Sequence, residues 1–222
     1  MATKSNEKIK MLSVMAMLTA LAIVADFFLR VKVGGFLTYE PKDVVITIAA
    51  FIYNPVVGLI ISLVVCLVEM VTISDTGFIG LLMNFLASAM FVGVSSVIYY
   101  RKKTLPRAII GLLAGSAAMI AVMLLWNYII TPIYMQIPRE MVVKMMPTLL
   151  LPFNAIKAGL NAALVLFLYK GVVTALRKSK LLPTRESNDS ENKRSNTIIM
   201  VVISALAVAT MILILLIFAK II

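Results

Sequence analysis

Residues 78–100, FIGLLMNFLASAMFVGVSSVIYY, contain no charged side chain. An α-helix rises about 1.5 Å per residue, so this stretch is long enough to cross the hydrocarbon core of a bilayer, which is about 30 Å thick. Four basic residues lie close behind it: Arg101, Lys102, Lys103 and Arg107. An apolar stretch of this length, followed by a basic cluster, predicts a transmembrane helix that ends at the cytoplasmic surface.

Further apolar runs lie on both sides of this stretch. Residues 9–29, 44–53 and 56–73 precede it, and residues 108–130, 149–176 and 197–222 follow it. The run 44–53 is short for a full crossing, and Asn54-Pro55 marks a turn into the next run. We therefore predict an all-α integral membrane protein: a six-helix bundle in residues 1–180, a polar linker at 181–196, and an additional C-terminal transmembrane helix at 197–222.

The composition excludes a water-soluble globule. Of the 222 residues, 62% are apolar and 14% are charged, against about 25% charged in an average soluble domain. There is no histidine, which removes the commonest metal ligand and general base. The sequence also lacks the nucleotide-binding motif G-x-x-x-x-G-K-[ST], the zinc motif H-E-x-x-H and the nucleophile motif G-x-S-x-G. We expect no enzymatic activity, no catalytic residue and no bound metal or cofactor.

The distribution of basic residues predicts the orientation in the membrane. The net charge is +11, and lysine and arginine concentrate near the N-terminus, in residues 101–107 and in residues 170–194. In a membrane protein such an excess indicates topology rather than nucleic-acid binding, because cytoplasmic loops are enriched in basic residues. The N-terminus is therefore expected in the cytoplasm, and the loops 30–42, 74–77 and 131–147 on the outer side.

Several polar side chains interrupt the apolar runs, mostly in their outer halves. Such residues are costly in lipid and normally face the interior of the bundle or a binding site. Asn154, Lys157 and Asn161 have i, i+3, i+7 spacing and share one helix face. Lys157 needs an acidic partner, for which Glu69, Asp43 and Asp75 are candidates. We expect an outward-opening polar pocket, and the full set is Asp26, Asp43, Glu69, Asn84, Asn127, Asn154, Lys157 and Asn161.

Each of these features also has a purely structural interpretation. The buried amides can hydrogen-bond between helices without a ligand. Trp126, Tyr128 and Tyr134 can form an interfacial aromatic belt. The residues Leu37, Thr38 and Tyr39, after Gly34-Gly35, can either close over a ligand or form an ordinary exposed turn.

Two pairs of small residues predict close helix contacts. Ala16 and Ala20 are four residues apart in the first run, and Gly111 and Gly115 in the fifth. Small residues at this spacing allow another helix to approach closely. We interpret the glycine pair as internal packing within the bundle.

Four short motifs together resemble the riboflavin-specific S-component of energy-coupling factor (ECF) transporters. Together with six spans of which the second is short, they carry the resemblance, and they read Phe36-Leu37…Asp43, Asn84-Phe85, Asn127-Tyr128…Pro132…Tyr134 and Pro152-Phe153-Asn154…Lys157. Ala16-x-x-x-Ala20 is similar to the alanine motif by which S-components dock on a coupling subunit. The resemblance covers about residues 9 to 178.

The resemblance implies a membrane-embedded subunit that captures riboflavin outside the cell. It would deliver the vitamin into the cell together with a transmembrane coupling subunit and two cytosolic ATPases. The ATP cycle of these partners would tip the S-component so that it releases the vitamin inside. The implied docking residues are Ala16 and Ala20. The implied substrate-binding residues are Leu37, Thr38, Tyr39, Asp43, Asn84, Asn127, Asn154, Lys157 and Asn161.

Three other functions remain open from the sequence. One is an S-component for a different vitamin. Another is a stand-alone secondary transporter in which Glu69 or Asp43 binds a proton. The third is a membrane scaffold without a ligand, against which the outer polar cluster argues.

Overall fold

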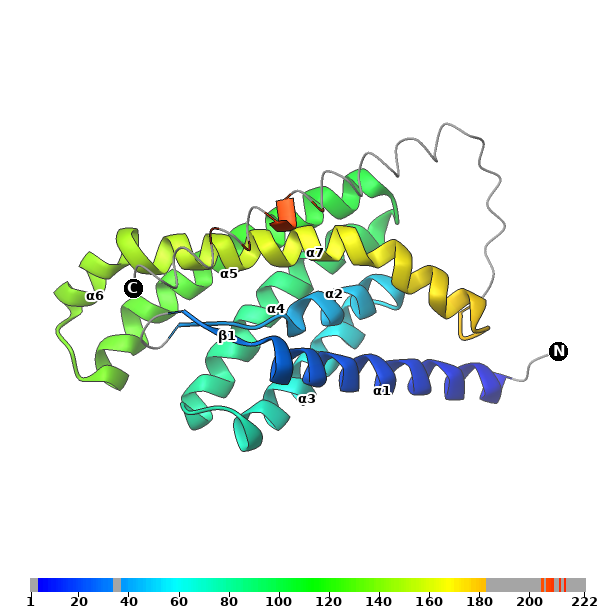
Figure 1. Cartoon of the computed structure of the whole chain (residues 1–222), viewed down its shortest axis with the longest axis horizontal. Helices are drawn as coiled ribbons and strands as arrows, with labels where there is room; N and C mark the ends of the chain where they lie inside the picture. Colours follow the sequence, from blue (N-terminus) through cyan, green and yellow to red (C-terminus); the bar gives the residue numbers. More distant parts are fainter. Residues whose placement is uncertain are drawn as a thin grey trace.

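The computed structural model describes residues 4–33, 37–182 and the six helical positions 205, 207–209, 212 and 214. The described part of the chain is almost entirely helical, with a two-stranded antiparallel hairpin after the first helix (Figure 1). In chain order the elements are α1 (Lys4–Leu29), β1 (Val31–Lys32), β2 (Thr38–Tyr39), α2 (Lys42–Ile52), α3 (Pro55–Thr72), α4 (Gly77–Arg101), α5 (Leu105–Met135), α6 (Arg139–Met145), the π-helical turn η1 (Met146–Leu150) and α7 (Leu151–Lys178).

The turn predicted at Asn54-Pro55 is confirmed and has a clear local cause. The side chain of Asn54 caps α3 by accepting a hydrogen bond from the backbone N–H of Val57 at 2.9 Å. Pro55 occupies the first helical position, where its missing N–H costs nothing. The short α2 therefore folds back directly onto α3.

The predicted loop at 131–147 is largely helical. Helix α5 continues to Met135, and α6, η1 and α7 follow one another without an irregular break. Pro132 did not end α5, although a proline inside a helix is normally unfavourable. The helix ends instead at Gln136, which adopts a left-handed conformation with φ of 54°.

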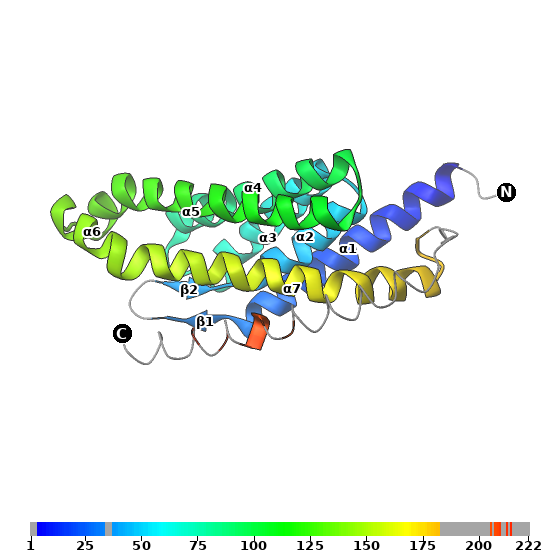
Figure 2. The same cartoon turned by 90° about the horizontal axis from the view of Figure 1, so that it is seen from above.

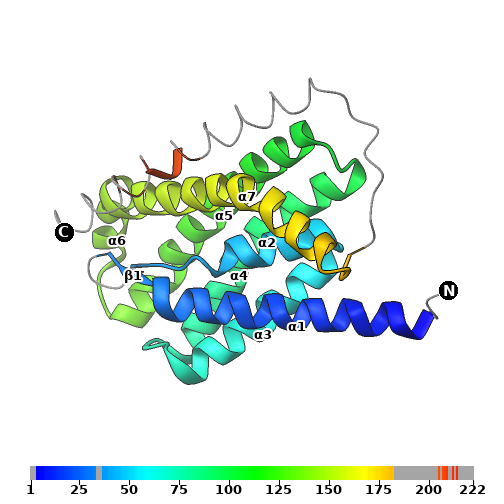
Figure 3. The ribbon, with the colours of Figure 1, turned by 45° about the vertical axis from the view of Figure 1, so that its right-hand side comes forward.

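The loops gather at two opposite ends of the bundle, which Figures 1 and 3 show from two sides. At one end, Lys103 after α4 donates to the carbonyl of Ile52 at the end of α2, at 3.3 Å. At the other end, Lys32 of the hairpin pairs with Asp75 before α4, at 3.0 Å. Figure 2 shows the hairpin toward the same end as α6. We call these the basic end and the hairpin end; their assignment to the cytoplasm and the outside stays a prediction.

Helices α4 and α5 pack against each other at the two glycines of α5. A Cβ atom on Gly111 would lie 2.6 Å from the carbonyl oxygen of Ser95, and one on Gly115 would lie 2.6 Å from that of Phe91. Both distances are too short for a real side chain, so only glycine permits this approach. The interpretation of this pair as internal packing is confirmed.

Five helical segments in the described part of the chain are long and apolar enough to cross a membrane: Asn6–Leu29, Pro55–Thr72, Gly77–Arg101, Leu105–Met135 and Arg139–Lys178. Large apolar side chains are exposed on their outer faces; Phe28 and Val71 are 75% and 76% exposed. Polar side chains, by contrast, are buried between the helices. This inside-out distribution fits a lipid solvent and confirms the all-α integral membrane class.

The C-terminal predictions fall almost entirely outside the described residues. The linker at 181–196 begins with Leu181 and Leu182, which pack against the core. In the predicted helix at 197–222, the described positions are helical, and Val208 packs near the hairpin end. The division into bundle, linker and last helix therefore stays a prediction.

Candidate substrate-binding site

A cavity of about 290 Å³ opens among the helices at the hairpin end. This volume is at the lower limit of typical small-molecule sites, which is about 300 Å³. Its wall combines apolar side chains, mainly Met83, Met119, Met123 and Phe153, with a larger number of polar and charged groups. The polar and charged lining residues are Arg30, Lys32, Thr38, Glu40, Asp75, Thr76, Asn84, Asn127, Tyr134, Asn154 and Lys157.

The structure gathers six of the nine sequence-predicted binding residues around this cavity. They come from the hairpin, α4, α5 and α7, and are Leu37, Thr38, Asn84, Asn127, Asn154 and Lys157. Residues far apart in the sequence thus meet at one place, as a ligand site requires. Their role in binding remains a prediction.

The other three predicted binding residues are buried beside the cavity and do not line it. Tyr39 donates its hydroxyl hydrogen bond to Oδ1 of Asn161 at 3.0 Å, and this pair joins the hairpin to α7. Asp43 accepts a hydrogen bond from the hydroxyl of Ser88, which joins α2 to α4. Asn161 lies one turn beyond Lys157, is fully buried and is not among the residues that line the cavity. Tyr39, Asp43 and Asn161 therefore lie in the layer of packed side chains that surrounds the site.

The cavity amides on α5 and α7 are held by their own helices. Asn127 donates to the carbonyl of Met123 at 2.7 Å, and Asn154 donates to that of Leu150 at 2.8 Å. Each amide bonds one turn back along its helix, which fixes its side-chain rotamer. Within the described residues, Oδ1 of Asn154 accepts no hydrogen bond, so it is available to a ligand donor.

Glu40, directly after β2, organises the charged wall of the cavity. One of its oxygens accepts from Arg30 at 3.1 Å and from Asn84 at 3.2 Å. Its other oxygen lies 3.2 Å from the ammonium groups of both Lys42 and Lys157. Burial alone would raise the pKa of Glu40, but the lysine charges lower it below its usual value. Glu40 is therefore ionised and ties the hairpin to α2, α4 and α7.

The sequence prediction for the partner of Lys157 was wrong. Lys157 pairs with Glu40, whereas Glu69 pairs with Lys42 and Arg30, and Asp75 with Lys32. Asp43 hydrogen-bonds Ser88. Glu40 and Lys42 were missed because both were assigned to a loop on the outer side, outside the predicted helices. The hairpin folds into the bundle instead and buries both residues to 2% and 1% exposure.

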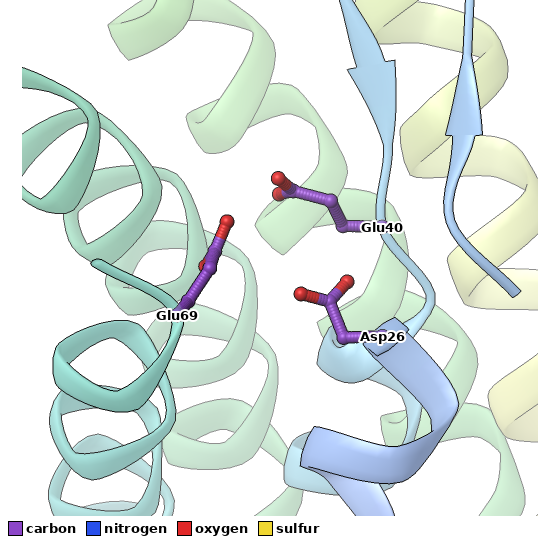
Figure 4. A group of neighbouring side chains, drawn as sticks. All are labelled: Asp26, Glu40 and Glu69. Atoms are coloured by element: carbon purple, nitrogen blue, oxygen red, sulfur yellow. The ribbon is translucent and has the colours of Figure 1, made fainter. Parts of the chain in front are cut away.

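Asp26, Glu40 and Glu69 form a cluster of buried carboxylates beside the cavity. They come from α1, the hairpin and α3, and point toward one another (Figure 4). One oxygen from each lies within 4.8 Å of the others, a spacing that could suit a metal ion. The ammonium group of Lys42 contacts all three carboxylates, at 3.9 Å from Asp26 and closer to the other two. A lysine thus supplies the positive charge that a metal would bring.

The two alanines predicted to dock a partner lie on the exposed face of α1. Ala16 and Ala20 are exposed, whereas Val14, Leu18 and Ala22 on the opposite face are buried in the core. The alanine face is therefore free of intramolecular packing within the described residues. Its use as a docking face remains a prediction.

Comparisons with known proteins identify the family. Residues 10–169 match the family model of the ECF transporter substrate-specific component. The chain is 29% identical over 179 residues to the riboflavin transporter RibU of Staphylococcus aureus (strain TCH60), covering 76% of this chain and 93% of the relative. A solved structure of the S component of a bacterial ECF transporter matches with a TM-score of 0.65 and 29% identity, over 77% of this chain and 99% of that one. The chain therefore belongs to the substrate-specific S components of ECF transporters, a family of transport proteins rather than enzymes.

Proposed function

We propose that this S component binds riboflavin and serves its import. The observation that carries the proposal is the cavity at the hairpin end, in which amides and a lysine face an apolar wall. The similarity to a riboflavin transporter along 93% of that protein's length supports the same ligand.

The chemistry of the cavity matches the chemistry of riboflavin. The isoalloxazine ring of the vitamin is flat and uncharged, and its pyrimidine edge carries carbonyl and N–H groups. The oxygen of Asn154 can accept from a ring N–H, and the ammonium group of Lys157 can donate to a ring carbonyl. Met83, Met119 and Phe153 offer the apolar contacts that the ring faces require. The hydroxyl groups of the ribityl chain can hydrogen-bond with Thr38 and other polar residues of the lining.

In this proposal the S component works with a transmembrane coupling subunit and two cytosolic ATPases. The exposed face of Ala16 and Ala20 on α1 docks on the coupling subunit, because small side chains allow a close helix–helix contact. The basic end lies in the cytoplasm with the N-terminus, and the cavity opens outward. ATP hydrolysis by the partners then supplies the energy of import.

The decisive test is to purify the full chain in detergent and record its absorbance spectrum. Co-purified flavin gives a yellow protein with a characteristic visible spectrum. Riboflavin added to ligand-free protein should lose fluorescence with a saturable, one-to-one titration. A colourless protein that leaves riboflavin fluorescence unchanged, while it binds a different vitamin, would overturn the ligand assignment and leave the family assignment intact.

A further inference from the structure

The buried network around the carboxylate cluster has unequal numbers of acidic and basic groups. Four carboxylates belong to it, from Asp26, Glu40, Asp43 and Glu69, and each is at most 3% exposed. Three cationic side chains face them, from Lys42, Lys157 and the partly buried Arg30. Helix α4 contributes only the neutral Asn84 and Ser88, and Cys66 of α3 is a thiol. Fully ionised, the network would carry one uncompensated negative charge.

Asp26 is the carboxylate that the network leaves without support. Neither of its oxygens accepts a hydrogen bond from the described residues, although the side chain is 1% exposed. Its nearest cation, Lys42, is 3.9 Å away and lies closer to Glu40 and Glu69. Glu40, Glu69 and Asp43 each accept at least one hydrogen bond.

The cost of such a charge is high at this place. A buried ion without a matched partner loses hydration free energy that nothing in its surroundings restores. The carboxylates of Asp26 and Glu69 also face each other across the cluster, and the repulsion between adjacent buried carboxylates favours the protonation of one of them. Protonation removes the uncompensated charge and adds an O–H donor between them.

We propose that Asp26 and Glu69 form a proton-binding site that holds one shared proton at neutral pH. The proton brings the network to zero net charge. Arg30, Glu40 and Lys157 of the same network line the cavity, so the proton also removes one negative charge from the immediate surroundings of the cavity. This site is independent of the identity of the ligand.

Infrared spectroscopy of the full chain in detergent tests the proposal directly. Exposed carboxyl groups are ionised at pH 7, so only a protonated buried carboxyl group gives the carbonyl stretch of a carboxylic acid. We expect this band in the wild type, with a shift in D₂O. Asp26→Asn and Glu69→Gln each remove one carboxylate, bring the network to neutrality without a proton, and should each abolish the band. The matched control Asp75→Asn removes an exposed carboxylate and should retain it.

The same samples also supply a second measurement. Loss of the proton at high pH creates the uncompensated charge, so the thermal midpoint of the wild type should fall as the band disappears. In Asp26→Asn, the thermal midpoint should not show this fall at high pH.

A wild type without the band at pH 7 would overturn the proposal, and so would a band that persists in either folded variant. If the band is absent and sodium chloride, but not potassium chloride, raises the thermal midpoint, a metal cation takes the place of the proton and the proposal is again wrong. If one variant fails to fold, the other decides. If both variants fail to fold, aspartate and glutamate with isotope-labelled carboxyl groups are incorporated into the wild type instead. A band whose frequency shifts with neither label does not come from a carboxyl side chain and would overturn the proposal.

Discussion

Glu40 shows how much of the binding site depends on one carboxylate. Its two oxygens hold Arg30, Lys42, Asn84 and Lys157, which come from four different parts of the chain. Two of these partners, Asn84 and Lys157, are proposed to contact the ligand. Glu40 thus positions them in the absence of ligand, which lowers the entropy cost of binding.

Replacing Glu40 should destabilise the folded protein strongly. Glu40→Gln keeps the shape of the side chain but breaks the ion pair of Lys157, which has no other carboxylate within 4.0 Å among the described residues, and breaking a buried ion pair costs about 3 kcal/mol. The measurement is thermal unfolding of ligand-free protein in detergent. Asp75→Asn is the control, because the pair of Asp75 with Lys32 is exposed and should change stability by less than about 1 kcal/mol. Equal stability of the two variants would contradict the organising role of Glu40.

Replacing the proposed ligand contacts should weaken riboflavin binding. Asn154→Ala and Lys157→Ala each leave a polar group of the bound vitamin unmatched, which should cost on the order of 1–3 kcal/mol. Titration by quenching of flavin fluorescence measures the loss. Lys144→Ala, on α6 away from the cavity, should bind like the wild type. Unchanged affinity in both cavity variants would show that the site lies elsewhere.

The residues that could be predicted from the sequence are those whose neighbours are local. Asn154 and Lys157 were found because they share one face of one helix. Glu40 was missed because its four partners lie between 2 and 117 positions away, and no local pattern encodes their convergence. A weak signal existed: Glu40, Lys42 and Asp43 place two acidic residues and one basic residue in the short segment 40–43 of a largely apolar chain.

At the scale of elements, helices α4 and α5 pack closely against each other. Gly115→Ala should destabilise the protein by about 1–3 kcal/mol, because its Cβ would overlap the carbonyl of Phe91 and force the helices apart. Gly171→Ala is the matched control on α7, where a Cβ atom meets nothing within 4 Å. It should be neutral or stabilising by up to about 1 kcal/mol, since alanine favours helix. Thermal unfolding in detergent compares the two, and a harmless Gly115→Ala would refute the tight contact.

Helix α1 presents a second contact face that is unoccupied by the described residues. Ala16→Trp or Ala20→Trp should leave riboflavin binding intact but prevent docking on the coupling subunit, because the bulky ring blocks close approach. The readout is co-purification with the coupling subunit, together with vitamin uptake. Leu113→Trp is the control, since Leu113 is 65% exposed on α5, away from α1. Normal co-purification of both alanine variants would exclude this face.

At the scale of the whole molecule, the bundle should function without its last predicted helix. That segment, 197–222, carries no ionisable residue before Lys220 and so has no polar stripe for a polar ligand. We expect a chain truncated after residue 182, which keeps Leu181 and Leu182 in the core, to bind riboflavin as tightly as the full chain. Fluorescence titration of both forms measures this. A monodisperse truncated protein that no longer binds would place the last helix in the functional core.

The architecture was largely predictable, because lipid imposes long apolar runs that can be read directly. The hairpin and the ion network were not, since the burial of a charged loop depends on side chains from helices distant in sequence. The continuation of α5 past Pro132 was missed for a similar reason: the helices packed around a segment can stabilise it against its local preference.

The aromatic cluster near the basic end has a further consequence. Phe51 stacks on Tyr99 with ring centres 4.2 Å apart, and the hydroxyl groups of Tyr99 and Tyr169 lie 2.9 Å apart. None of these three residues lines the cavity. Within the described residues, the cavity therefore ends short of this aromatic cluster. For a bound ligand to pass from the hairpin end to the basic end, either the three aromatic side chains have to separate or the whole bundle has to reorient in the membrane.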